Sequence, residues 1–272
     1  MTIAQALDIA ASRLQVSCPK PLFEAELLLA HHLGKERLYL HIHGDEVVKD
    51  IDGYHQLIRR REAHEPYEYI VGETSFYDLY LSVVPGVLIP RPETELLIDQ
   101  AAAVIEREGI TSLIEIGVGS GAISVVLARK FPQLQIVATD ISEDVLLVAQ
   151  KNIDRYGVAG RVTLLQSNLM DEVTIDAGMV VSNPPYIAEG FRLERNVSDY
   201  EPHRALFGGR VGDELLKQII DDAFKRDIRW LACEMGYDQK RAIQEYVNEI
   251  DVEYIDFYQD LAGFDRGFIV RF

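Results

Sequence analysis

The spacing of apolar residues predicts a helical region at the start of the chain. The first apolar set recurs at helical intervals: Ile3, Ala6, Leu7, Ala10 and Leu14. Thr2 precedes this set and is suited to cap the helix. A second helix is expected from Pro21 to about Gly34, and another leads up to three consecutive arginines at 59–61.

The pattern changes after this region. Residues 69–89 are rich in β-branched and aromatic side chains, which favour strands, and Tyr77, Asp78 and Leu79 are suited to the bend of a hairpin. Pro92 then interrupts the chain before a helix that is expected to begin near Glu93. The chain is therefore expected to divide into three parts: a helical bundle over 1–70, a β-hairpin linker over 71–88 and a larger domain over 89–272.

Beyond residue 110, short apolar runs alternate with amphipathic stretches of helical length. The apolar runs are Leu113 to Ile116, Ile136 to Thr139, Val162 to Leu165, Met179 to Val181 and Trp230 to Cys233. The helical stretches are Ala122 to Lys130, Glu143 to Tyr156, Asp213 to Phe224 and Gln239 to Glu249. This alternation is typical of an α/β fold with a doubly wound, mainly parallel sheet.

Composition and charge narrow the classes of function. The 272 residues are 48% hydrophobic, and no apolar stretch is long enough to span a bilayer. The N-terminus lacks the basic-then-apolar layout of a secretory signal, so we expect a soluble cytoplasmic protein. Cys18 and Cys233 are too few and too far apart for a disulfide framework or a thiolate metal site. The net charge of −17 disfavours binding to the nucleic-acid backbone.

A glycine-rich loop follows the first apolar run of the larger domain. Its sequence is Glu115-Ile116-Gly117-Val118-Gly119-Ser120-Gly121, and a helix is expected to begin just after it. Such glycines let a ligand approach the backbone, and the helix N-terminus presents free N–H groups. Asp140, nineteen residues beyond Gly121, ends the next run, where a carboxylate can accept hydrogen bonds from ribose hydroxyls.

The loop alone leaves the cofactor open. Gly117, Gly119 and Ala122 also fit the dinucleotide fingerprint, so a nicotinamide oxidoreductase remains an alternative. Glu115 weighs against it, because an acid fits better beside a cationic ligand than beside a pyrophosphate.

The sequence Asn183-Pro184-Pro185-Tyr186 follows the fourth apolar run and should share a crevice with the glycine loop. The prolines stiffen the turn and leave carbonyl oxygens free to accept. The Asn183 oxygen is a further acceptor, and Tyr186 offers a flat ring. These acceptors can bind both hydrogens of a planar –NH2 group. Such binding orients the nitrogen toward an electrophile and helps to localise its lone pair.

Together the glycine loop, Asp140 and the Asn183 turn resemble the motifs of class I S-adenosyl-methionine-dependent methyltransferases that act on exocyclic or amide nitrogen. Further segments narrow this resemblance: Val87 to Glu95, Glu201-Pro202 with Ala205 to Gly209, Glu234 to Tyr237 and Asp260 to Gly263. With them, the whole chain is similar to the peptide-chain release factor glutamine N5-methyltransferase family.

The resemblance implies a Rossmann-like sheet of seven strands, ending in an antiparallel hairpin, and a helical domain that helps to dock the substrate. It implies N5-methylation of the glutamine in the Gly-Gly-Gln motif of class 1 peptide chain release factors, with S-adenosyl-L-homocysteine as the product. Catalytic roles fall on Asn183, Pro184 and Tyr186, and substrate-binding roles fall on the same residues together with Pro185. Cofactor-binding roles fall on Glu115, Gly117, Val118, Gly119, Ser120, Gly121, Asp140, Asn168, Leu169 and Asn183. We expect a monomer without a metal, with no direct nucleic-acid or membrane partner.

Two features leave room for other outcomes. Asn168 stands where the family usually has an aspartate facing the adenine amino group, although its oxygen can still accept. Arg91 either lines the lid of the cofactor pocket or pairs with Glu93 or Glu95.

Three alternatives for the function stay open from the sequence. They are an adenine N6 methyltransferase of nucleic acids, the nicotinamide oxidoreductase and a binding module without catalysis.

Overall fold

The computed structural model describes residues 1–272, which form two compact units. The smaller unit comprises Met1–Glu73 and Leu193–Tyr200, and the larger comprises Thr74–Arg192 and Glu201–Phe272. No helix has the combination of length and apolar character needed to cross a bilayer.

The smaller unit is helical. Its helices are α1 (Ile3–Leu14), α2 (Pro21–Leu33), α3 (Arg37–Ile42), α4 (Ile51–Glu62), α5 (Tyr67–Val71) and α9 (Arg195–Ser198). The predicted cap of α1 is confirmed, because Thr2 Oγ1 accepts a hydrogen bond from Gln5 N at 3.3 Å. Helix α2 ends as predicted at Gly34, whose φ of +61° suits a residue without a side chain. Helices α3 and α5 are not predicted, and α5 includes residues 69–71, which were expected to be extended.

The predicted hairpin is present as β1 (Glu73–Phe76) and β2 (Leu79–Ser82). Tyr77 lies in its bend with a φ of +50°, and its hydroxyl donates to Asp99 Oδ1 at 2.8 Å. The predicted helix after Pro92 is also present, with Glu93 as its N-cap residue.

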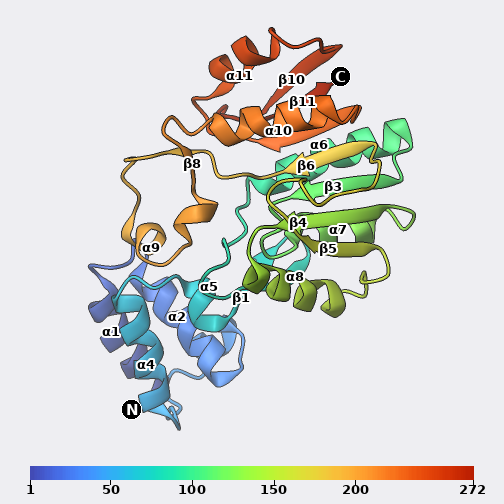
Figure 1. Ribbon diagram of the computed structural model, residues 1–272. Coiled ribbons are helices and arrows are strands. Elements are labelled where there is room, and N and C mark those ends of the chain that lie inside the picture. Colours follow the sequence, from blue (N-terminus) through green and yellow to red (C-terminus); the bar gives the residue numbers. More distant parts are fainter. The chain divides into compact units, whose positions relative to one another are not determined.

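The larger unit is built on a seven-stranded sheet, as predicted. Its strands are β3 (Ser112–Ile116), β4 (Gln135–Asp140), β5 (Val162–Gln166), β6 (Met179–Ser182), β9 (Trp230–Glu234), β10 (Tyr254–Gln259) and β11 (Asp265–Arg271). Their order is β10-β11-β9-β6-β3-β4-β5, and Figure 1 shows β6, β3, β4 and β5 side by side in this sequence. All pairs are parallel except those of β11, which runs antiparallel to both β9 and β10.

Helices cover both faces of this sheet. One face packs against α6 (Thr94–Glu108), α7 (Ala122–Lys130) and α8 (Glu143–Arg155), and the other against α10 (Glu214–Lys225) and α11 (Lys240–Val247). Side chains along β3 point alternately to the two faces of the sheet. Leu113 packs in the core on the side of α6, α7 and α8, and Ile114 packs in the core on the side of α10 and α11. Strands buried on both faces explain why these runs are continuously apolar.

The strand order creates a switch point beside β3. The chain proceeds from β3 to β4 and β5 on one side and then crosses to β6 on the other. Ligands of such folds bind beyond the carboxyl ends of the strands at this position. Three short elements not predicted from the sequence lie between β6 and α10: β7 (Ile187–Ala188), the 3₁₀ helix η1 (His203–Ala205) and β8 (Phe207–Gly209).

Gly208 in β8 packs directly on the turn that follows β6. A Cβ at this position would lie 2.3 Å from the Pro185 carbonyl oxygen and 2.6 Å from the Gly212 carbonyl oxygen. Because both obstacles are backbone atoms, Gly208→Ala is expected to lower the free energy of unfolding by about 2 kcal/mol. Gly160→Ala is the matched control, because a Cβ there meets no atom within 4 Å, and it should change stability by less than about 0.5 kcal/mol. Denaturant unfolding measures both, and equal effects would contradict the packing described.

Candidate functional site

A cavity of about 480 Å³ opens at the carboxyl ends of β3, β4 and β6. Its size is typical of a site for a cofactor or small ligand. Many of the predicted site residues line it together: Gly117, Gly119, Asp140, Asn168, Leu169, Asn183, Pro184 and Pro185. The glycine loop and the Asn183 turn therefore share one cavity.

The glycine loop presents bare backbone to this cavity. Gly117 N and Val118 N donate to the Thr139 carbonyl oxygen at 2.9 and 2.8 Å, which fixes the loop on the end of β4. Gly117 and Gly119 have φ values of +75° and +54°, and a Cβ at either would meet no protein atom within 4 Å. The positive φ angles favour glycine, and the absence of side chains leaves room for a ligand close to the backbone.

Asn152 of α8 anchors the glycine loop at Ser120. Reasoning from the sequence did not identify this residue. Its fully buried amide group donates to the Ser120 carbonyl at 2.8 Å and to the Ser82 carbonyl at 3.0 Å. Its oxygen accepts from Ser82 N at 2.8 Å. Gly121, with a φ of +84°, lies against Ala149 one turn earlier on the same helix. A buried polar residue in the middle of an amphipathic helix was the available indication.

Asp140 is placed at the cavity by the end of β4. Its carboxylate accepts from Gly119 N at 3.3 Å and from Ser142 N at 3.1 Å. Burial raises the pKa of Asp140, and these backbone donors and the Arg204 charge oppose that rise. The carboxylate therefore joins the glycine loop to the start of α8 at the cavity wall.

Asn168 and Leu169 close another side of the cavity. Leu169 has a φ of +48°, and its carbonyl accepts from Thr139 Oγ1 at 2.8 Å, which anchors this turn to β4. The Asn168 side-chain nitrogen donates to Asp171 Oδ2 at 3.1 Å. With its nitrogen engaged in this way, the Asn168 oxygen is the atom that remains to accept.

The turn after β6 is held in place from both sides. Ser182 Oγ donates to the Ile116 carbonyl at 2.8 Å, which joins the ends of β6 and β3. The side-chain nitrogen of Asn183 donates to Thr94 Oγ1 at 2.9 Å. Because Pro184 and Pro185 have no N–H, the turn offers the cavity acceptors and no backbone donors from these two residues.

Other predicted residues lie outside the cavity lining. Val118, Ser120 and Gly121 are buried residues of the glycine loop itself. Glu115 is 1% exposed and accepts a hydrogen bond from Ser124 Oγ of α7, and burial raises its pKa to about 8. Tyr186 is half-buried, and its hydroxyl donates to Glu234 Oε1 at 3.0 Å.

The structure rules out one of the two alternatives left open for Arg91. Its guanidinium lies 2.5 Å from Glu201 Oε1, and the other oxygen of Glu201 accepts from Ile89 N at 3.3 Å. The expected pairing with Glu93 or Glu95 is therefore wrong. Glu201 is 4% exposed and directly precedes Pro202 and η1, which do line the cavity. An acid far along the chain supplied the partner, which local spacing could not reveal.

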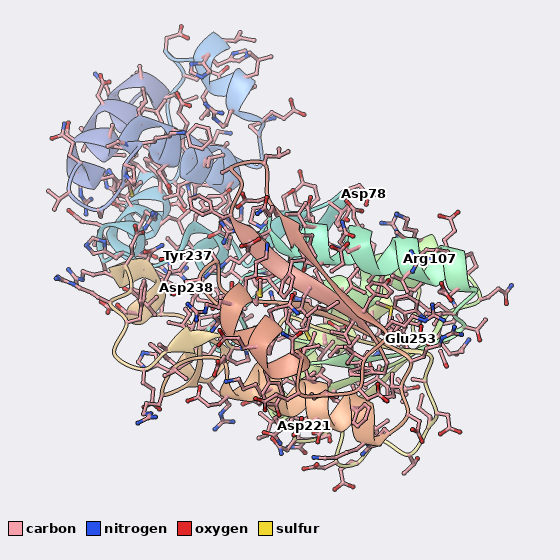
Figure 2. All side chains as sticks on the ribbon, turned by 90° about the horizontal axis from the view of Figure 1, so that it is seen from above. Asp78, Arg107, Asp221, Tyr237, Asp238 and Glu253 are labelled. Atoms are coloured by element: carbon pink, nitrogen blue, oxygen red, sulfur yellow. The ribbon has the colours of Figure 1, made fainter.

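Acidic side chains are spread over separate elements of the larger unit. Figure 2 labels three of them: Asp78 in the hairpin bend, Asp221 in α10 and Glu253 before β10. Two of them pair with arginines, Asp78 with Arg129 at 3.2 Å and Glu253 with Arg271 at 2.5 Å. None of these three acids lines the cavity described above, whose lining includes Arg204.

Two family models match the chain: "PrmC N-terminal domain" over residues 5–72 and "Methyltransferase small domain" over residues 93–199. A release factor glutamine methyltransferase of Koribacter versatilis is 37% identical over 282 residues, covering 100% of this chain and 99% of that protein. The protein of the same description from Vibrio cholerae is 34% identical and covers 98% of this chain and 95% of its own length.

Solved structures resemble the fold. The N-terminal domain of human METTL16 in complex with SAH superposes with a TM-score of 0.52 at 20% identity, covering 71% of this chain and 76% of that chain. A ribosomal protein L11 methylase from Lactobacillus delbrueckii gives a TM-score of 0.51 at 17% identity, with 69% and 82% covered.

Proposed function

The chain belongs to the release factor glutamine methyltransferase family, and from this premise we propose that it N5-methylates the glutamine of the Gly-Gly-Gln motif in class 1 peptide chain release factors. The observation that carries the proposal is the Asn183 amide at the cavity wall, whose nitrogen is engaged by Thr94. Its oxygen is left to accept a hydrogen bond from an incoming amide –NH2 group.

The cavity suits S-adenosyl-L-methionine. The bare backbone at Gly117 and Gly119 leaves space for the methionine part, and the Asp140 carboxylate offers acceptors for ribose hydroxyls. The Asn168 oxygen suits an amino group of the adenine ring. When bound, this cofactor supplies an electrophilic methyl group.

The acceptor chemistry rests on orientation. An amide nitrogen is a poor nucleophile because its lone pair is delocalised into the carbonyl. Asn183 Oδ1 and the Pro184 carbonyl would each accept one N–H of the glutamine amide, which fixes the nitrogen and favours a localised lone pair. Tyr186 supports this turn from behind through Glu234. The nitrogen would gain one methyl group as the carbon–sulfur bond to that methyl breaks, S-adenosyl-L-homocysteine would leave, and one amide proton would be released to solvent, so no redox partner is required.

The parts of the chain take separate roles in this proposal. Residues 1–70 help to dock the release factor, the hairpin over 71–88 links them to the rest, and residues 89–272 carry out the transfer. The enzyme would act as a cytoplasmic monomer in translation termination. The family and the net charge of −17 favour a protein substrate, whereas the adenine N6 alternative would need a local basic groove on an acidic protein.

Methyl transfer from labelled S-adenosyl-L-methionine tests the proposal. The substrates are an intact release factor, the same factor with its Gly-Gly-Gln glutamine replaced by alanine, tRNA and duplex DNA. We expect label on the intact factor alone. Label on nucleic acid, or equal label on the alanine variant, would overturn the substrate assignment.

A further inference from the structure

A buried hydrogen-bonded chain lies behind Asn183 and joins three elements of the fold. Glu234, at the end of β9, accepts from Thr94 Oγ1 through its Oε2 at 2.8 Å. Thr94, the first residue of α6, accepts in turn from the Asn183 side-chain nitrogen at 2.9 Å. Glu234 is 1% exposed and Thr94 is 4% exposed, so water competes little for these bonds.

The direction of each bond follows from the chemistry of the groups. An ionised carboxylate can only accept, so the Thr94 hydroxyl proton is committed to Glu234. The Thr94 oxygen then has only lone pairs to offer, and the group of Asn183 that faces it must be –NH2. As a result, the Asn183 oxygen is turned the other way, toward the cavity that Asn183 lines.

We propose that Glu234 and Thr94 are positioning residues that hold the Asn183 amide with its oxygen facing the substrate nitrogen. This inference rests on the proposed transfer to an amide –NH2 group. In the opposite orientation, Asn183 would present its own –NH2 to the substrate –NH2, and two donors would face each other. Without the Thr94 hydroxyl, the hydrogen bond that holds the Asn183 –NH2 away from the substrate is lost.

The other oxygen of Glu234 is held by the same turn. Oε1 accepts from the Tyr186 hydroxyl at 3.0 Å, and the Tyr186 carbonyl accepts from Gln239 Nε2 at 2.9 Å. Gln239 ends the loop after β9, in which Figure 2 labels Tyr237 and Asp238. Both oxygens of the carboxylate therefore point at groups that support the Asn183 turn.

Protonation of Glu234 would remove the constraint, because a carboxyl group can donate to Thr94. Burial raises the pKa of Glu234 to about 7, opposed by the hydrogen bonds from Thr94 and Tyr186. Among charged neighbours, Glu93 before α6 raises this pKa and Arg266 of β11 lowers it. The neighbouring Tyr258 of β10 stays protonated, because burial raises its own pKa well above the usual range. Only the ionised Glu234 carboxylate fixes the orientation of the Asn183 amide, so kcat should rise as the pH increases through about 7.

Paired substitutions at Thr94 test the proposal in the full-length enzyme with a release factor as substrate. Thr94→Val keeps the shape and removes the hydroxyl, and we expect kcat to fall about tenfold. Thr94→Ser returns the hydroxyl and is expected to recover most of that loss. The Kd for S-adenosyl-L-homocysteine should stay within about threefold of wild type in both, which reports an intact fold and cofactor cavity. Equal kcat values for the valine and serine variants, or loss of cofactor binding with valine alone, would overturn the inference.

The pH profile gives a second, independent readout. Glu234→Gln keeps the size of the side chain but has no ionisation near neutrality, so the rise of kcat through about pH 7 should disappear. A retained inflection in this variant would contradict the role of Glu234. Failure of the proposed function itself would look different, because the wild-type enzyme would then not methylate the release factor at any pH.

Discussion

Replacing Asn183 by alanine is expected to lower kcat for methyl transfer by about 10²–10³-fold, as removal of one preorganised polar group at a reacting centre commonly does. The side-chain oxygen that accepts from the substrate amide is lost, and the Pro184 carbonyl is left as a single acceptor. The nitrogen then loses both its orientation and part of its electron density. Single-turnover kinetics, with the enzyme in excess over the release factor, measure this effect free of product release.

The companion measurements separate chemistry from folding. Asn248→Ala is a matched control, because Asn248 is exposed at the end of α11, and its kcat should stay within about twofold of wild type. Binding of S-adenosyl-L-homocysteine to Asn183→Ala should weaken only a few-fold. A kcat within tenfold of wild type for Asn183→Ala would remove this residue from the proposed reaction.

Replacing Asp140 by alanine is expected to raise the Kd for S-adenosyl-L-homocysteine about 100-fold. Hydrogen bonds to a charged group contribute about 1.5–3 kcal/mol each, and 2.7 kcal/mol corresponds to a hundredfold change in affinity. The substitution also removes the acceptor for Gly119 N and Ser142 N, so the glycine loop loses one of its anchors. Isothermal titration calorimetry measures the change directly.

Asp144→Ala provides the control for charge. Asp144 is exposed in the first turn of α8, four residues from Asp140, and its removal changes the net charge by the same amount. Its Kd should remain within about twofold of wild type. If Asp140→Ala binds within threefold of wild type, the ribose contact assigned to Asp140 is wrong.

The alternation of apolar runs and helices predicted the fold because strands buried on both faces must be continuously apolar. The glycine loop and Asn183 could be predicted to meet because both follow parallel strands, whose carboxyl ends share one edge of the sheet. The periodicity of apolar residues did not predict those elements whose structure depends on tertiary contacts. Helix α5 contains aromatic residues of high strand propensity, and the short strands β7 and β8 are too brief to show any period.

The contacts made by the supporting residues of the site could not be predicted from the sequence for the same reason. Thr94, Asn152 and Glu234 come from three separate elements and meet the site residues only after folding. Nothing in the spacing of Arg91 points to Glu201, which lies 110 positions away. Such long-range pairs depend on how the loops cross the end of the sheet, and single-sequence patterns do not contain that information.

Mass spectrometry of the methylated product tests the central claim most directly. A release factor is incubated with the enzyme and S-adenosyl-L-methionine, digested, and the peptide that contains Gly-Gly-Gln is fragmented. The proposed chemistry predicts one added methyl group, located on the side-chain nitrogen of that glutamine. A methyl group on any other residue, or an unmodified peptide from an enzyme that binds S-adenosyl-L-homocysteine, would contradict it.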